Sequence, residues 1–135
     1  MKSSSRIIGV LVIVFCIGWV LSAVYKKQQL KNNFKLSEGH VNRIIKPTYK
    51  NSNRSIQYEY EVAEKKYSGE SGFNVCEKIS ENDLNLLLVN KSFPVAYSVK
   101  DANQSIIIIT RKDAAMFNYT IPDSMLVYDS ILTCK

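Results

Sequence analysis

The feature that most constrains this sequence is an uncharged apolar run near its amino terminus, from Ile7 to Tyr25. As an α-helix, these 19 residues would extend about 29 Å, close to the roughly 30 Å hydrocarbon core of a bilayer. Trp19 and Tyr25 lie toward the far end of the run, where amphipathic rings favour the membrane interface. Two lysines follow at once. We therefore predict a transmembrane helix over residues 7–25, preceded by a short flank, residues 1–6, with the lipid bilayer as the first partner.

A cleaved signal peptide is the alternative interpretation of the same run. Such a peptide has an apolar stretch of about 7–15 residues and then a small-x-small cleavage site. The run here is longer, and Leu21 is large where a cut after Ala23 would need a small residue. A cut after Ser22 stays open. We expect an uncleaved anchor, in which Cys16 is a small apolar residue of the span.

The orientation of this anchor is nearly balanced in sequence. The positive-inside rule compares the Lys and Arg residues close to the two ends of a span. Lys2 and Arg6 stand on one side with the amino terminus, and four lysines, Lys26, Lys27, Lys31 and Lys35, stand on the other. We expect a signal-anchor that places the C-terminal domain outside the cytoplasm, and the cytoplasmic orientation stays open.

The basic excess of the chain belongs to this N-terminal arm. The net charge is +6, and six Lys or Arg residues precede the first acid, Glu38. Residues 36–135 carry 12 basic and 12 acidic residues and are formally neutral. Because nucleic-acid-binding domains present a basic surface, we expect no nucleic-acid partner.

The remainder of the chain reads as a linker and one small domain. Residues 26–38 are polar and are predicted as the linker, and residues 39–135 as the domain. Besides the hairpin described next, strands are expected over residues 40–50, 93–99 and 105–110, the last as a central strand covered on both faces. Capping signals predict short helices over residues 81–89 and 112–117 and after Pro122. The predicted fold class is mainly β with short helices (α+β), a small barrel- or sandwich-like antiparallel domain.

A β-hairpin is the clearest local signal in the domain. Ile56, Tyr58, Tyr60 and Val62 alternate with polar residues, which is the period of a half-buried strand. Residues 63–65 make a tight connection to a return strand over residues 66–71. We predict that Tyr58, Tyr60, Val62 and Tyr67 form the hairpin core, and that Gly69 marks a bulge or a close backbone approach.

No catalytic or metal-binding motif accompanies this pattern. The single histidine, His40, has no partner nearby in the sequence, and metal sites use several His, Cys or carboxylate ligands at short spacing. Glu59 and Glu61 share the predicted solvated face of the hairpin. We therefore expect no enzyme activity, no catalytic residue, no cofactor and no metal.

Cys76 and Cys134 are the two thiols outside the predicted span. In an exported domain they could pair, and a disulfide of this loop length is worth roughly 3–4 kcal/mol in the chain-entropy model. In the cytoplasm they would stay reduced. Their pairing depends on the orientation of the anchor.

Four short motifs follow one another along the domain: Tyr58-x-Tyr60-x-Val62, Lys66-Tyr67-x-Gly69, Phe93-Pro94-Val95-x-Tyr97 and Asn103-x-Ser105-Ile106. Together they resemble a group of small bacterial proteins that have one or two membrane helices and a compact β-rich domain of unknown function. The match covers about residues 39–110. It departs at Lys91-Ser92, where the group often has a glycine, and at residues 101–104, which lack a proline. The resemblance implies an architecture and brings no activity with it.

These observations predict a single-pass membrane-anchored module without enzymatic activity, which binds a protein partner or is associated with the cell envelope. A structural or assembly subunit of a membrane complex is the first alternative. A small membrane-tethered hydrolase or transferase is the second, and it would need a cleft with convergent titratable groups.

Overall fold

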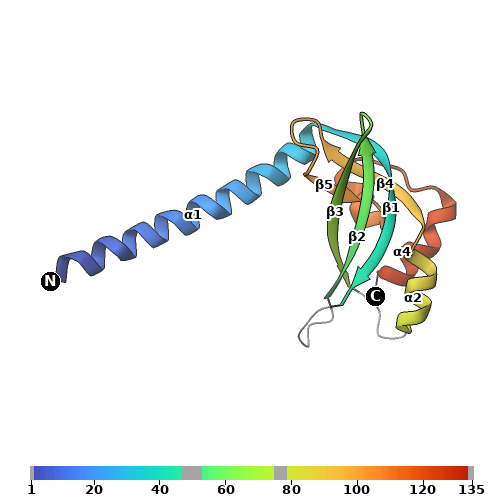
Figure 1. Cartoon of the computed structure of the whole chain (residues 1–135), viewed down its shortest axis with the longest axis horizontal. Coiled ribbons are helices and arrows are strands. Elements are labelled where there is room, and N and C mark those ends of the chain that lie inside the picture. Colours follow the sequence, from blue (N-terminus) through green and yellow to red (C-terminus); the bar gives the residue numbers. More distant parts are fainter. Residues whose placement is uncertain (1, 47–52, 75–78, 134–135) are drawn as a thin grey trace.

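The structure is a computed structural model that describes residues 2–46, 53–74 and 79–133. A long N-terminal helix is followed by five antiparallel strands in a nearly closed, barrel-like sheet with short helices around it (Figure 1). This confirms the predicted fold class. The elements are α1 (Lys2–Asn32), β1 (Phe34–Ile45), β2 (Asn53–Val62), β3 (Lys65–Asn74), α2 (Glu81–Leu88), β4 (Ser92–Ser98), β5 (Ser105–Ile107), α3 (Arg111–Met116), the 3₁₀ turn η1 (Asp123–Met125) and α4 (Leu126–Leu132).

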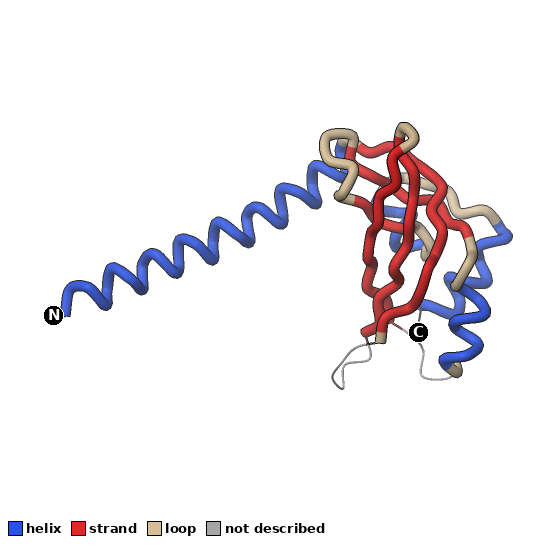
Figure 2. Tube along the Cα trace, in the orientation of Figure 1, coloured by secondary structure: helices blue, strands red, loops and turns tan. Residues whose placement is uncertain are grey.

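Helix α1 projects away from the barrel as one continuous rod (Figure 2). It is long and apolar enough to cross a membrane, as an anchor or a signal sequence would be. The three residues that define the predicted span are largely exposed: Ile7 is 58% exposed, Trp19 72% and Tyr25 63%. Apolar side chains left in this state need a covering other than the protein itself.

The predicted linker is regular structure instead. Helix α1 continues to Asn32, and β1 begins at Phe34, so that only Asn33 separates them. The difference arises because two apolar residues that look scattered in the sequence pack against the domain. Leu30 is 4% exposed, and the ring of Phe34 meets that of Phe117 edge-to-face at 4.9 Å.

The strand order is β3-β2-β1-β4-β5, and every pairing is antiparallel. The hairpin of β2 and β3 turns through Ala63 and Glu64, whose φ angles are 50° and 63°. Positive φ at both central residues is the type I′ geometry that matches the twist of a two-residue hairpin. The connection is therefore one residue shorter than predicted.

Two hydrophobic clusters lie on the two sides of the sheet. The larger one fills the barrel and includes Val41, Ile56, Tyr58, Tyr60, Leu84, Leu88, Phe93, Val95, Ile107, Ile109, Met125 and Leu132. The smaller one, called the outer cluster below, lies outside the sheet and comprises Leu30, Ala96, Ile108, Ala114 and Phe117. It joins α1 and α3 to β4 and the segment after β5.

The isoleucine run of residues 105–110 does not form the central strand that was predicted. Strand β5 spans only Ser105–Ile107 and ends the strand order. The run is nevertheless buried on both faces, because Ile107 and Ile109 join the barrel core while Ile108 joins the outer cluster. Burial on both sides, and not a central position, explains its composition.

The helices begin at the predicted caps. Ser80 accepts a hydrogen bond from the Asp83 amide at the start of α2, which buries Leu84 and Leu88. Thr110 and Asp113 form a reciprocal capping box at α3. Such caps satisfy backbone groups that a short helix leaves unpaired.

Candidate functional site

The hairpin tyrosines point into the barrel. Tyr58 is fully buried and Tyr60 is 3% exposed, while Val62 and Tyr67 are partly buried and pack against them. The ring of Tyr60 stacks on those of Tyr67 and Tyr97, with centroid separations of 5.8 and 6.2 Å. The four residues therefore lie inside the domain and offer no exposed aromatic platform.

Tyr58 spans the barrel interior. Its ring lies over Gly69, the residue opposite it on β3, where a β-carbon would overlap the ring. Its hydroxyl lies 3.1 Å from the Ser105 Oγ, within hydrogen-bond distance. Burial raises the pKa of Tyr58 to about 12. The close backbone approach predicted at Gly69 is thus present, and Tyr58 links β2 to β5 across β3.

Tyr60 fixes the loop between β4 and β5. Its hydroxyl donates to the Ala102 carbonyl, and burial raises its pKa as well. Asp101, in the same loop, accepts hydrogen bonds from the backbone and side chain of Asn103 and from Gln104, and these bonds lower its pKa. This end of the barrel is closed by polar contacts.

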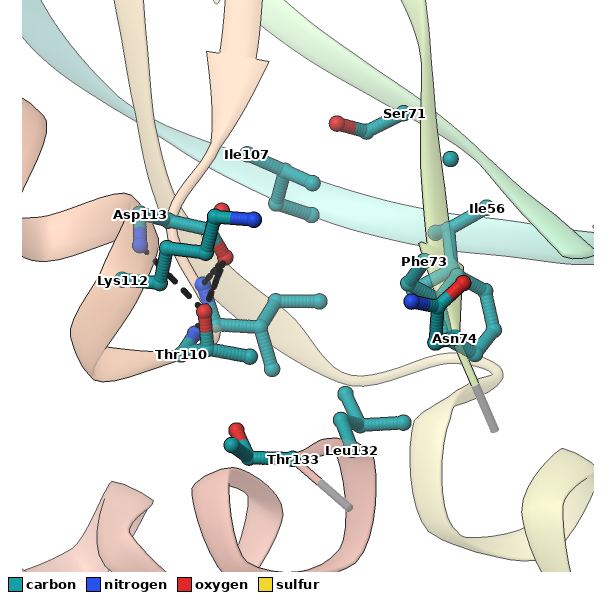
Figure 3. A pocket seen from close by; sticks show the side chains of 12 residues that line it. Ile56, Ser71, Phe73, Asn74, Ile107, Thr110, Lys112, Asp113, Leu132 and Thr133 are labelled. Carbon is teal, nitrogen blue, oxygen red and sulfur yellow. Dashed lines mark hydrogen bonds between the residues drawn. The ribbon is translucent and has the colours of Figure 1, made fainter. Parts of the chain in front are cut away.

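The opposite end of the barrel contains a cavity of about 450 Å³, which we call the seam cavity. It lies between the last residues of β3 and the segment that runs from β5 into α3, remote from the junction of α1 and β1 (Figures 1 and 3). Its volume falls within the range of ligand sites, roughly 300–1,000 Å³. The lining comprises Ile56, Ser71, Gly72, Phe73, Asn74, Ile107, Ile109, Thr110, Lys112, Asp113, Leu132 and Thr133.

The polar groups of the seam cavity do not form an acid–base pair. The Asp113 Oδ2 accepts hydrogen bonds from the Thr110 amide at 3.0 Å, the Thr110 Oγ1 at 2.8 Å and the Ile109 amide at 3.4 Å. This carboxylate is therefore committed to the helix cap. Lys112 extends its amine toward β3 (Figure 3) and forms no ion pair with any residue that the structure describes. The cavity therefore has apolar and polar walls, one carboxylate held in the helix cap and one cation.

A second polar arrangement was not foreseen from the sequence. The Ser92 Oγ lies 2.7 Å from the His40 Nδ1, and His40 is flanked in register by Ser92 on β4 and by Glu59 on β2. All three are exposed, and none of them lines the seam cavity. His40 and Ser92 are 52 residues apart in the chain, so only the strand register reveals this row.

The remaining candidates for chemistry are the metal-ligating side chains and the cysteines. Among the described residues, no group of three or more His, Cys, Asp or Glu side chains is placed to hold a metal ion. Cys16 is a free thiol exposed on α1. Cys76 and Cys134 lie outside the described residues, but Asn74 and Thr133, which precede them closely, line the same cavity.

Comparison with known proteins finds no family model, no curated protein and no solved structure that matches the chain. The resemblance to small membrane-anchored β-domain proteins therefore stays a prediction, and the functional argument depends on the geometry of the chain itself.

Proposed function

We propose that this protein is a single-pass membrane-anchored binding module without catalytic activity, which holds the seam cavity out to a partner on the outer side of the membrane. The observation that carries this proposal is the contrast along α1. Over residues 7–25 its apolar side chains are exposed, whereas Leu30, in its last turns, is buried in the outer cluster. The first part suits a bilayer, and the second packs against the domain.

The junction of α1 with the barrel supports a fixed placement of the domain. The Asn33 carbonyl accepts a hydrogen bond from the Val99 amide at 3.0 Å, and Phe34 packs on Phe117. Residues 26–32 continue the helix beyond the span and add about 10 Å at 1.5 Å per residue. The anchor and the domain therefore form one body. The end of β3 that lines the cavity lies away from their junction (Figure 1).

The chemistry of the cavity supports binding over catalysis. Its lining mixes apolar and polar residues, its only carboxylate caps α3, and its lysine forms no ion pair among the described residues. General acid–base work requires a proton-transferring group in reach of a substrate. The row formed by Glu59, His40 and Ser92 has a hydroxyl next to an imidazole, but it lies exposed on the outside of the sheet.

Membrane fractionation tests the anchor. We expect the intact chain in the carbonate-resistant membrane fraction, with its N-terminal residues present in the intact mass. Val14→Arg places a charge in the middle of the span at a cost of about 2.5–3.5 kcal/mol and should release the chain or prevent insertion. Gln28→Arg, on the exposed helix beyond the span, is the matched control and should stay membrane-bound.

A reporter at the C-terminus tests the side. We expect an alkaline phosphatase fusion to be active and a fluorescent fusion to be dark when the domain is exported. Recovery of a soluble chain that begins near residue 23 would show a cleaved signal sequence and overturn the anchor. Fluorescence without phosphatase activity would place the domain in the cytoplasm.

A further inference from the structure

The sheet has two end strands that lie side by side without a ladder between them. Strands β3 and β5 end the strand order, and no pairing joins them among the described residues. Strand β3 has ten residues and β5 only three. Much of the outer edge of β3 therefore has no partner strand, and edge strands of this kind are templates for pairing with another chain.

The hydrogen bonds of β1 determine which residues of β3 face that edge. The Val41 amide donates to the Lys91 carbonyl at 2.9 Å, and the Val41 carbonyl accepts from the Asn90 amide at 2.8 Å, so both groups point away from β2. Tyr58, opposite Val41, must then direct its backbone groups toward Gly69 on β3. Because this direction alternates along a strand, the residues that turn N–H and C=O to the open edge are Ser68, Glu70, Gly72 and Asn74.

The segment that faces β3 is partly covered by side chains of the domain. The Tyr58 hydroxyl lies 3.1 Å from the Ser105 Oγ on β5, and just beyond β5 the Ile109 and Thr110 amides donate to the Asp113 carboxylate. The longer edge of the seam without a partner strand among the described residues is therefore β3.

The C-terminal half of β3 has little of the usual protection of an edge, and its one charged residue is Glu70. Lysines on an edge strand discourage pairing, and β3 carries them only next to the turn, at Lys65 and Lys66. From Ser68 to Asn74 the strand reads SGESGFN, with no lysine and no proline. A Cβ at Gly72 would meet no atom closer than 3.9 Å, so the outer face of the strand is open at this position.

The seam cavity lies against this same stretch. Ser71 and Phe73, the inward-facing residues of this part of β3, line it together with Ile107, Ile109 and Leu132. Lys112 extends toward β3 from the other wall (Figure 3). An extended backbone on the β3 edge would therefore have an apolar recess beside it and a cation within reach.

We infer that the edge of β3 at residues 70–74 takes up an extended peptide segment of a partner protein by β-strand addition. The segment places an apolar side chain in the seam cavity and an acidic residue beside Lys112. This inference rests on the proposed function and names the partner class. A second copy of this chain fits less well, because its own Ser71 and Phe73 face its own barrel and bring no side chain for the recess.

The experiment uses the full chain in lipid nanodiscs and a displayed library of random peptides about seven residues long, counter-selected on empty nanodiscs. Selected sequences should alternate apolar and polar residues and carry an acid. N-methylation of the selected peptide should weaken binding at every second amide, by about tenfold or more, and leave the amides between them unaffected, because only one edge of an added strand bonds to β3.

Substitutions locate the site. Gly72→Pro removes an amide on the edge and should weaken peptide binding by about tenfold or more. Lys112→Glu should weaken binding of the acidic peptide, and Lys100→Glu, exposed on a loop at the other end of the barrel, should not. Tyrosine circular dichroism of each variant reports whether the barrel is intact, and Lys112→Glu is decisive if Gly72→Pro unfolds.

Several results would overturn the inference. They are an absence of selected peptides, an N-methyl scan without a period of two, and peptide binding indifferent to both Gly72→Pro and Lys112→Glu. A dimer that Gly72→Pro dissociates, with no peptide selected, would assign the edge to a second copy. If a small apolar molecule such as an alkyl alcohol displaces the peptide while N-methylation and Gly72→Pro have no effect, that result would assign the cavity to small ligands. Failure of the chain to integrate into membranes would overturn the proposed function and leave the peptide result unchanged.

Discussion

The ring of Tyr58 lies over Gly69, and its hydroxyl reaches across to Ser105 on β5. The side chain of Tyr58 can cross β3 only because Gly69 has no side chain of its own. This contact closes the seam above the cavity, and it joins the end strands of the sheet through a side chain where no ladder joins them. The packing of the barrel therefore depends on the absence of a side chain at Gly69.

Gly69→Ala should destabilise the protein by about 1–3 kcal/mol, because the added methyl overlaps a buried ring and forces the packing to shift. Gly72→Ala, three residues along the same strand, is the matched control and should change the free energy of unfolding little, since its β-carbon enters open space. Urea unfolding of the full chain in micelles measures both. Equal effects of the two substitutions would contradict the overlap.

Stability should fall as the pH rises from 10 to 12. The pKa of Tyr58 is raised from 10.0 to about 12 by burial, so the folded state holds its proton after the unfolded chain has lost it. The contribution is complete below pH 10, and about 2–3 kcal/mol is lost across this window. Unfolding free energies at pH 9 and pH 11.5 should show a smaller loss for Tyr58→Phe than for the native chain. Identical pH slopes would contradict a buried, protonated Tyr58.

Leu30→Ala should destabilise the β-domain by about 2–4 kcal/mol, because it empties a buried position in the outer cluster. Leu21→Ala makes the same change on an exposed part of the span and should leave the unfolding midpoint of the domain unchanged. Tyrosine circular dichroism follows the domain in both variants. A midpoint that is the same for Leu30→Ala and Leu21→Ala would show that the helix is not docked.

The turn between β2 and β3 should accept a stabilising change. Ala63 and Glu64 both have positive φ, which costs an ordinary residue about 1 kcal/mol or more and which Asn-Gly adopts readily. The pair of substitutions Ala63→Asn and Glu64→Gly should raise the free energy of unfolding by about 1 kcal/mol. Ala115→Gly, exposed on α3, should lower it by about 1 kcal/mol, which shows that glycine itself does not stabilise this protein.

Cys76 and Cys134 should form a disulfide in the exported protein. Alkylation of the denatured, unreduced chain should then modify only one thiol, Cys16, and all three after reduction, as intact mass would show. The two cysteines lie outside the described residues, and the prediction is supported by Asn74 and Thr133, which line one cavity. Three reactive thiols without reduction would contradict it in a domain that the reporters place outside.

The parts of the fold that were predictable depend on local pattern. The alternation from Ile56 to Val62 placed the hairpin, and the spacing of Thr110 and Asp113 placed α3. Both signals are carried by residues within a few positions of one another. The strand expected over residues 40–50 instead runs from Phe34 to Ile45, because its start is set by packing against Phe117, far along the chain.

The candidate site was not predictable, because it is made of distant segments. The seam cavity joins β3 to residues from β5, α3 and α4, and no motif marks any of these segments. Likewise, the proximity of His40 to Ser92 depends on the register of β1 against β4. Period and composition locate elements, whereas long-range register decides which side chains meet.

In a chain anchored as proposed, the single residue between α1 and β1 makes the bilayer part of the geometry of the domain. A transmembrane helix changes its tilt when the thickness of the surrounding membrane changes. With Asn33 alone as the connection and Leu30 docked in the outer cluster, the barrel cannot absorb such a tilt in a flexible joint. The barrel must therefore tilt together with the helix. The distance of its far end from the lipid surface then changes with the thickness of the membrane.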